Sequence, residues 1–216
     1  MLDDFRHKGL RKKLVDTIKS KGIRNQKVLE AIGKIPRHLF LDKAFEEWAY
    51  KDQAFPIGHG QTISQPYTVA YQTELIDPQP DDKILEIGTG SGYQACVLAL
   101  MCKKIYTIER QKSLFDKTNE FLQEIGFERI RTLFGDGYKG ASRFAPFDKI
   151  LVTAGADFIP EALLKQLKTG GILVIPLGKG EDKTMTRITR VSENKYETEE
   201  FGLFRFVPFM KGIKKN

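Results

Sequence analysis

The chain has 216 residues, 41% of them hydrophobic and 29% charged, and its formal net charge at pH 7 is +7. This composition is that of an ordinary soluble globular protein, and it excludes a low-complexity chain. No apolar run approaches the length of a membrane span, and the charged N-terminus lacks the apolar core of a signal peptide. We therefore expect one domain, residues 1–216, in the cytoplasm, with no membrane partner.

The basic residues gather near the two ends of the chain, at 6–13 and 211–215. No stacking aromatics are interleaved with them, so the surplus charge indicates a solvated surface rather than a nucleic-acid partner. The three histidines, His7, His38 and His59, are scattered, and the two cysteines fall on or just after one predicted helix. Sequence neighbours therefore assemble no metal site.

Residues 1–50 predict a helical cap that precedes the sheet. Apolar side chains recur every four positions from Leu10 to Ile18, and a second helical stretch breaks at Pro36. The large apolar residues that follow, Trp48 among them, are expected to pack in the core.

The stretch 51–66 is rich in Pro, Gly, Gln, Ser and Thr, which predicts a loop. A loop of this length in a compact domain is often functional, so we expect it to belong to the active site. A helix is expected from about Tyr67 to Ile76.

From residue 83 onward, strand patterns alternate with helical patterns, which indicates right-handed crossovers and a parallel sheet. The helix that opens at Pro160 is expected to run through Leu167 and to end at Gly170. The fold class is therefore α/β: a doubly wound, Rossmann-like sheet over 67–216, mostly parallel with an antiparallel C-terminal edge. The predicted strands are 84–87, 104–109, 130–134, 147–153 and 172–175, followed by an antiparallel pair at 185–191 and 201–208.

Three glycines at alternate positions, Gly88, Gly90 and Gly92, follow the first of these strands and precede an apolar helix. Glycine lets the backbone approach a nucleotide-like ligand without side chains in the way. The dinucleotide fingerprint places its third glycine where this chain has Tyr93, so the spacing argues against NAD. A glycine-rich turn that binds nothing is the alternative.

Acidic residues mark the ends of the first strands, and ligands of a doubly wound sheet bind beyond those ends. Glu86 precedes the glycines. Glu109 ends the second strand, where a carboxylate can accept hydrogen bonds from both ribose hydroxyls of an adenosine. Asp136 and Gly137 follow the third strand and can receive an adenine amino group. The alternatives are a solvated strand end beside Arg110 and an ordinary Asx turn at Asp136.

From about residue 35 to 209 the chain resembles the protein-L-isoaspartate O-methyltransferases, a family with a Rossmann-like fold that uses S-adenosylmethionine (AdoMet). The segment 56–66 is the most diagnostic, because other AdoMet methyltransferases lack it. The segments that carry the resemblance are 36–40, 56–66, 88–92, 135–137, 159–164 and 206–208.

This resemblance implies methyl transfer from AdoMet to the α-carboxylate of L-isoaspartyl residues in damaged proteins and peptides. S-adenosylhomocysteine (AdoHcy) is the expected product, and the ester then collapses to a succinimide that partly reopens as aspartate. The resemblance also implies that Ser64 is the active-site residue and that Ile63, Gln65, Val207 and Pro208 contact the peptide. The residues implied to hold the cofactor are Glu86, Gly88, Thr89, Gly90, Ser91, Gly92, Glu109, Arg110, Asp136 and Gly137.

The expected acceptor is a carboxylate with a side-chain pKa of about 3.9, which is ionised at neutral pH and needs no general base. We expect the Ser64 hydroxyl to donate a hydrogen bond to one carboxylate oxygen while the other faces the methyl group. The alternative is that Ser64 caps the helix that follows it. His59 is expected to support the loop. Met210 stands where the family often has threonine, which removes a polar contact expected near the cofactor.

Two other functions stay open from the sequence. The +7 charge fits an RNA methyltransferase, although the chain carries no added RNA-binding module. A non-catalytic AdoMet-binding adaptor would keep the cofactor motifs and use the fold only as a scaffold.

Overall fold

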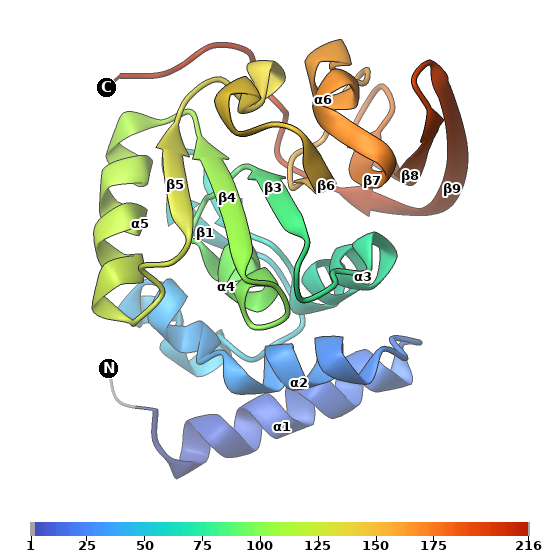
Figure 1. Ribbon diagram of the computed structural model, residues 1–216. Coiled ribbons are helices and arrows are strands. Elements are labelled where there is room, and N and C mark those ends of the chain that lie inside the picture. Colours follow the sequence, from blue (N-terminus) through green and yellow to red (C-terminus); the bar gives the residue numbers. More distant parts are fainter. Residues whose placement is uncertain (1–2, 216) are drawn as a thin grey trace.

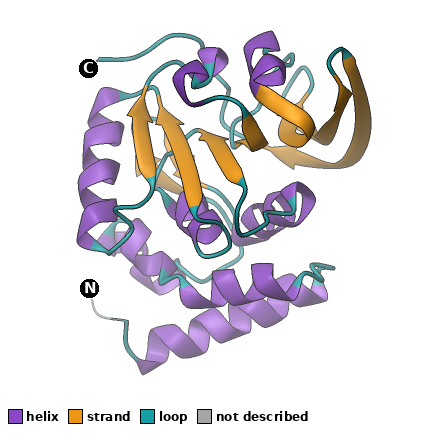
Figure 2. Cartoon of the chain, viewed as in Figure 1, coloured by secondary structure: helices purple, strands orange, loops and turns teal. Residues whose placement is uncertain are grey.

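The computed structural model describes residues 3–215, and a seven-stranded sheet forms its centre (Figures 1 and 2). The strands lie in the order β5-β4-β3-β6-β7-β8-β9, in which β5 to β7 are parallel and β8 and β9 run antiparallel to their neighbours. This arrangement confirms the predicted α/β fold class. The bounds are β3 Lys83–Ile87, β4 Lys104–Glu109, β5 Arg131–Phe134, β6 Phe147–Val152, β7 Leu167–Leu177, β8 Asp182–Ser192 and β9 Lys195–Arg205.

The direction of the chain through the sheet reverses at β3. From β3 the chain moves outward through β4 to β5, then returns and places β6 on the other side of β3. The connections leave on opposite faces at such a point, so a crevice opens beyond the carboxyl ends of the two central strands. Ile87 and Val152, the last residues of β3 and β6, pair at this crevice.

Alternate residues of the central strands point into two separate cores, as the pleat of a strand requires. Ile84, Leu151 and Val174 join a core covered by helices α1 to α5. Leu85 and Ile150 join a smaller core under α6. In the described part of the chain, every helix is too short or too polar to cross a lipid bilayer. The helices are α1 Phe5–Ser20, α2 Gln26–Lys34, α3 Pro66–Ile76, α4 Tyr93–Ala99, α5 Lys112–Glu124 and α6 Glu161–Gln166.

The helical cap is two layers deep, because α2 packs on α3 and α4 while α1 packs outside α2 (Figure 1). Phe40, in the 3-10 turn Arg37–Phe40, makes edge-to-face contacts with aromatic rings of α4 and α5. Trp48 is 45% exposed, so the expectation that it packs in the core is wrong. It ends a second 3-10 turn, Lys43–Trp48, at the surface, where the Lys51 ammonium lies over its ring.

Arg37 is a fully buried cation that ties the cap to the segment before the active site. Its Nε donates to the Ala49 carbonyl at 3.0 Å and its Nη2 donates to the Gln53 carbonyl at 3.3 Å. The guanidinium also lies 5.0 Å from the centre of the Tyr93 ring on α4. Burial lowers the pKa of Arg37 to about 10, which still leaves it charged at neutral pH.

The stretch predicted as a loop, 51–66, contains a two-stranded antiparallel hairpin, β1 Phe55–Gly58 and β2 Gln61–Ile63. His59 and Gly60 form its two-residue turn, and both have positive φ (55° and 68°), the backbone that matches the twist of a tight hairpin. The buried ends of the two strands, Phe55 and Ile63, pair with each other. The hairpin therefore holds this stretch in a fixed shape.

The helix that opens after Pro160 is shorter than expected, because α6 ends at Gln166 and β7 begins at Leu167. Gly170 has a φ of 77°, and the register against β6 jumps between Leu167 and Ile172. The glycines therefore form a bulge inside a long strand instead of ending a helix.

Candidate active site

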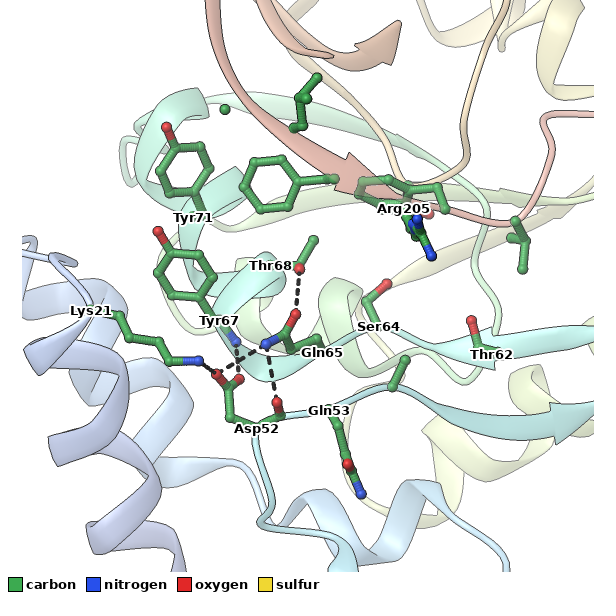
Figure 3. A pocket seen from close by; sticks show the side chains of 17 residues that line it. Lys21, Asp52, Gln53, Thr62, Ser64, Gln65, Tyr67, Thr68, Tyr71 and Arg205 are labelled. Carbon is green, nitrogen blue, oxygen red and sulfur yellow. Dashed lines mark hydrogen bonds and ion pairs between the residues drawn. The ribbon is translucent and has the colours of Figure 1, made fainter. Parts of the chain in front are cut away.

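Two cavities meet at the carboxyl ends of β3 and β6. A small cavity of about 60 Å³ lies against the glycine turn, and a larger one of about 1010 Å³ runs between α3 and β9 (Figure 3). Four residues line both cavities: Thr62, Ser64, Thr153 and Val207. We call these four residues the shared wall. It brings the hairpin, the start of α3, the end of β6 and the segment after β9 to one place.

The glycine turn 88–92 needs its glycines for space as well as for backbone shape. Gly88, Gly90 and Gly92 all have positive φ (99°, 53° and 84°). A Cβ atom on Gly88 would lie 2.6 Å from the Thr153 hydroxyl oxygen. That hydroxyl lies 2.9 Å from each of the Ile87 and Gly88 carbonyl oxygens, so it cannot move away without losing hydrogen bonds.

Glu109 holds the glycine turn against the end of β4. Its Oε2 accepts a hydrogen bond from the Gly90 N–H at 3.1 Å, and its Oε1 accepts one from the Gln111 N–H at 2.9 Å. Glu109 is 5% exposed and lines the small cavity, so it is not a solvated strand end. Each carboxylate oxygen keeps further acceptor capacity, because an ionised carboxylate offers about four lone-pair sites.

Glu86 lies beneath the glycine turn and does not line either cavity. Its Oε2 accepts a hydrogen bond from the Thr107 hydroxyl, which is hydrogen-bonded in turn to the Thr89 hydroxyl at 2.8 Å. Burial raises the pKa of Glu86 to about 8; the Thr107 hydrogen bond opposes this rise and the negative charge of Glu109 adds to it. Any contribution of Glu86 to ligand binding therefore passes through these threonines.

Three of the cofactor residues predicted from the sequence, Arg110, Asp136 and Gly137, lie outside the small cavity. Asp136 accepts a hydrogen bond from the Tyr138 N–H at 3.0 Å, which is the Asx turn given above as an alternative. Gly137 is buried, with no room for a Cβ between Ile87 and Phe209. The Arg110 side chain donates to the carbonyls of residues 211 and 212 in the C-terminal segment. Thr89 and Ser91, in contrast, line the small cavity.

The Ser64 hydroxyl has no hydrogen-bond partner among residues 3–215, and Ser64 does not cap α3. The N-cap position is Gln65, whose side chain makes no capping bond. The carboxylate of Asp52 supplies the cap instead, because its Oδ1 accepts a hydrogen bond from the Tyr67 N–H at 2.8 Å. The capping alternative for Ser64 is therefore wrong. Its hydroxyl is not used by the helix and is free to bind a ligand at the shared wall.

Asp52 connects three parts of the molecule (Figure 3). Besides capping α3, its Oδ2 accepts hydrogen bonds from Gln65 Nε2 at 3.1 Å and from the Lys21 ammonium at 2.5 Å. The Asp52 carbonyl also accepts from Gln65 Nε2 at 3.0 Å. The side chain of Asp52 is only 8% exposed, so its carboxylate is largely shielded from water. They fix the backbone on the C-terminal side of Ser64.

The predicted peptide-contact residues separate into two groups. Ile63 is buried against the small cavity, Gln65 lines the larger one, and Val207 belongs to the shared wall. Pro208 faces a different cavity, together with Met210, because the N–H and C=O of Gly155 bond the residues on either side of Pro208. Met210 is 52% exposed there and does not line the two cavities of the site.

Two of the scattered histidines meet in the cap. The rings of His7 and His38 stack at 3.8 Å, and with Asp3 they place three potential metal-ligand atoms within 4.8 Å of one another. The Asp3 carboxylate is paired with the Arg11 guanidinium at 2.9 and 3.0 Å. Nitrogen lone pairs lie in the imidazole plane, so parallel rings do not aim at a common ion. We assign this cluster to holding α1 on the 3-10 turn that contains His38.

Sequence reasoning missed Thr62, Thr153, Asp52 and Gln94. Thr153 directly follows β6, so the rule that ligands bind beyond strand ends was sufficient to find it. Gln94 lines the small cavity from α4. Asp52 reaches Tyr67 across 15 residues, and no local pattern announces such a contact.

The family model for protein-L-isoaspartate(D-aspartate) O-methyltransferase matches residues 9–214. The protein-L-isoaspartate O-methyltransferase of Christiangramia forsetii is 55% identical over 211 residues, which cover 98% of this chain and 99% of that one. A solved protein-L-isoaspartate O-methyltransferase superposes with a TM-score of 0.84 at 26% identity, covering 94% of this chain and 67% of the other. A chain from Plasmodium falciparum assigned to the same enzyme, solved with S-adenosyl-L-homocysteine, gives a TM-score of 0.81 at 24% identity, with 93% and 98% covered.

The buried Glu86 predicts a pH-dependent stability that Glu86→Gln removes. Between the ordinary pKa of 4.5 and the folded value of about 8, the folded chain binds more protons than the unfolded chain. The Glu86 contribution to the free energy of unfolding therefore falls as pH rises through this window, by up to about 1.4 kcal/mol per pH unit. In urea titrations from pH 5 to 8.5, the advantage of Glu86→Gln over the parent should grow with pH. Parallel stability curves for the two proteins would contradict a raised pKa.

Proposed function

The chain belongs to the protein-L-isoaspartate(D-aspartate) O-methyltransferase family, and on this premise we propose how its site transfers the methyl group of AdoMet to the α-carboxylate of L-isoaspartyl residues in damaged proteins. The ester then collapses to a succinimide and begins repair. The observation that carries this proposal is the position of Ser64. Its free hydroxyl lies on the wall that the glycine-turn cavity shares with a cavity wide enough for a peptide.

The larger cavity suits an extended, exposed peptide. Its floor is aromatic, with Tyr67, Tyr71 and Phe204 packed together. Its other side is β9, the outermost strand of the sheet, where Leu203 is 68% exposed. An edge strand offers unpaired main-chain N–H and C=O groups, so an isoaspartyl segment can add to it by strand pairing. Val207 then lies beside the segment as it reaches the shared wall.

The cofactor half of the site is the small cavity. We propose that the backbone of 88–92 approaches the cofactor closely and that Glu109 uses its remaining lone pairs for the ribose hydroxyls. Bound AdoMet supplies a sulfonium, whose methyl group is already attached to a good leaving group. At about 60 Å³ the cavity has room for only a few waters, so we propose that its wall opens to admit a nucleoside while the glycine turn keeps its shape.

The acceptor needs positioning rather than deprotonation. A carboxylate is ionised at neutral pH, so the chain must hold one oxygen in line with the methyl group and keep water out. We propose that the Ser64 hydroxyl donates to the other oxygen and thereby sets the angle of the carboxylate. His59 is exposed on the hairpin turn with its ring 3.4 Å from the Ser113 hydroxyl, outside the shared wall, which fits a supporting role.

We also propose a single domain with three functional parts. Residues 1–50, 51–66 and 67–216 act as cap, active-site segment and cofactor-binding sheet of one domain. Cys96 and Cys102 are buried free thiols, which suits the cytoplasm proposed for the enzyme.

A methyl-transfer assay tests the function directly. The purified enzyme receives radiolabelled AdoMet and one of three acceptors: an isoaspartyl peptide, its normal aspartyl twin, or total RNA. We expect base-labile label on the isoaspartyl peptide alone. Only in this peptide does the backbone run through the aspartyl side chain, which leaves the α-carboxylate free. Label on RNA would favour the RNA methyltransferase, and no transfer to any acceptor would favour the adaptor.

Ser64→Ala should lower turnover of the isoaspartyl peptide by about tenfold to a hundredfold, because one hydrogen bond to the reacting carboxylate is lost. The melting temperature should stay within error, since the hydroxyl bonds nothing else in the described chain. Ser192→Ala, at the exposed end of β8, is the matched control and should change neither quantity. Unchanged turnover in Ser64→Ala would remove the positioning role.

Asp52→Ala should act on the same step through the backbone. Loss of the α3 cap should lower the free energy of unfolding by about 1 kcal/mol. We expect kcat to fall by about tenfold, because the displaced Ser64 no longer sets the angle of the acceptor carboxylate. Asp16→Ala, on the exposed face of α1, is the control. A purely structural Asp52 would lower stability and leave kcat per folded molecule unchanged.

A further inference from the structure

Gln94 carries an unused buried acceptor and is one of the residues that line the small cavity. It is the second residue of α4, it is only 7% exposed, and it lines the cavity beside the glycine turn. Its side-chain oxygen is buried and has no hydrogen-bond partner among residues 3–215. Leaving a buried acceptor unpaired costs about 1–3 kcal/mol, so such a group on a residue that lines a ligand cavity points to a donor on the ligand.

The orientation of the Gln94 amide is fixed by its neighbours on α3. The Thr73 hydroxyl donates its single proton to the Val69 carbonyl at 2.7 Å, because a carbonyl can only accept. The Thr73 oxygen can therefore only accept from Gln94, and Gln94 Nε2 donates to it at 2.9 Å. A flipped amide would set two acceptors against each other. The amide oxygen, and not the NH₂ group, is thus the atom left over.

Other unpartnered buried atoms do not compete for this role. Of the residues that carry such atoms within 3–215, only Gln94 and Tyr93 line the small cavity. The Tyr93 ring packs against Arg37 and Phe40 of the cap. Glu86 and Gln111 also carry an unpartnered oxygen, but neither lines the cavity.

The position of Gln94 indicates which end of the cofactor lies next to it. The ribose and adenine belong on the side of β4, where Glu109 ends the strand. Gln94 lies on the side of α3, with Val69, Ile63 and Ser64 lining the same cavity. Because Ser64 must stand near the methyl-bearing sulfur, the groups beyond the sulfur fall on this side. In AdoMet these are a short methylene chain, an ammonium and a carboxylate, and only the ammonium donates hydrogen bonds.

We propose that the Gln94 side-chain oxygen accepts a hydrogen bond from the α-ammonium of AdoMet and AdoHcy and so sets the position of the amino-acid end of the cofactor. This inference rests on the proposed function, because it takes AdoMet as the ligand. A hydrogen bond to a charged donor is stronger than one between neutral groups, so its loss should be visible in binding.

The test is a calorimetric titration of the purified enzyme with AdoHcy and with its analogue that lacks the amino group. Gln94→Leu should weaken AdoHcy binding by about tenfold or more. The same variant should bind the desamino analogue within about twofold of the parent enzyme, because that ligand never made the bond. Gln72→Leu is the matched control: Gln72 is a buried neighbour on α3 with an unpartnered oxygen, but it does not line the cavity.

The possible outcomes distinguish a failure of the Gln94 inference from a failure of the proposed methyltransferase function. Equal weakening of both ligands by Gln94→Leu would overturn the inference and leave the methyltransferase function standing. A parent enzyme that binds neither ligand would overturn both. Should Gln94→Leu fail to fold, Gln94→Met, which follows the shape of glutamine more closely, carries the same comparison.

Discussion

The capping of α3 by Asp52 is the interaction on which the site depends. A helix needs acceptors for its first N–H groups, and a serine at its start would normally supply one. Here Asp52 accepts from the Tyr67 N–H, and Gln65 and Lys21 hold the carboxylate in place. Ser64 therefore keeps its hydroxyl for the shared wall. The cost is that the site depends on a contact between residues 15 positions apart, which also connects α1 to the start of α3.

Much of the fold follows from local patterns, and the exceptions have identifiable causes. Buried parallel strands are rich in apolar and β-branched residues, so β3 (Lys-Ile-Leu-Glu-Ile) and β4 (Lys-Ile-Tyr-Thr-Ile-Glu) are recognisable from composition alone. The hairpin is not, because Pro56 and Gly58 are poor strand residues and its turn is His-Gly instead of the familiar Asn-Gly. The glycines before Ile172 signal a helix end as easily as a bulge; the pairing of β7 with β6 decides between them.

The sequence predicts those parts of the candidate site that lie at the end of one strand and in the turn that follows it. Glu109 and the glycines follow from position alone, because ligands gather beyond the carboxyl ends of parallel strands. Glu86 shows the limit of that rule: side chains alternate along a strand, and its side chain lies under the turn, where it bonds Thr107. Asp52 and Gln94 depend on contacts with α3, and such tertiary contacts leave no periodic trace in the sequence.

The peptide unit at Gly90 has a further consequence. Glu109 accepts from its N–H, and the Thr118 hydroxyl donates to its carbonyl at 2.7 Å. Glycine loses more backbone conformational entropy than any other residue when it is ordered. At Gly90 this entropy is already lost when the chain folds. A nucleoside that enters finds the turn already rigid, so little entropy is subtracted from its affinity at that point. Enzyme molecules that wait through a shortage of methyl donor thus keep this turn assembled, and repair can resume as soon as the supply returns.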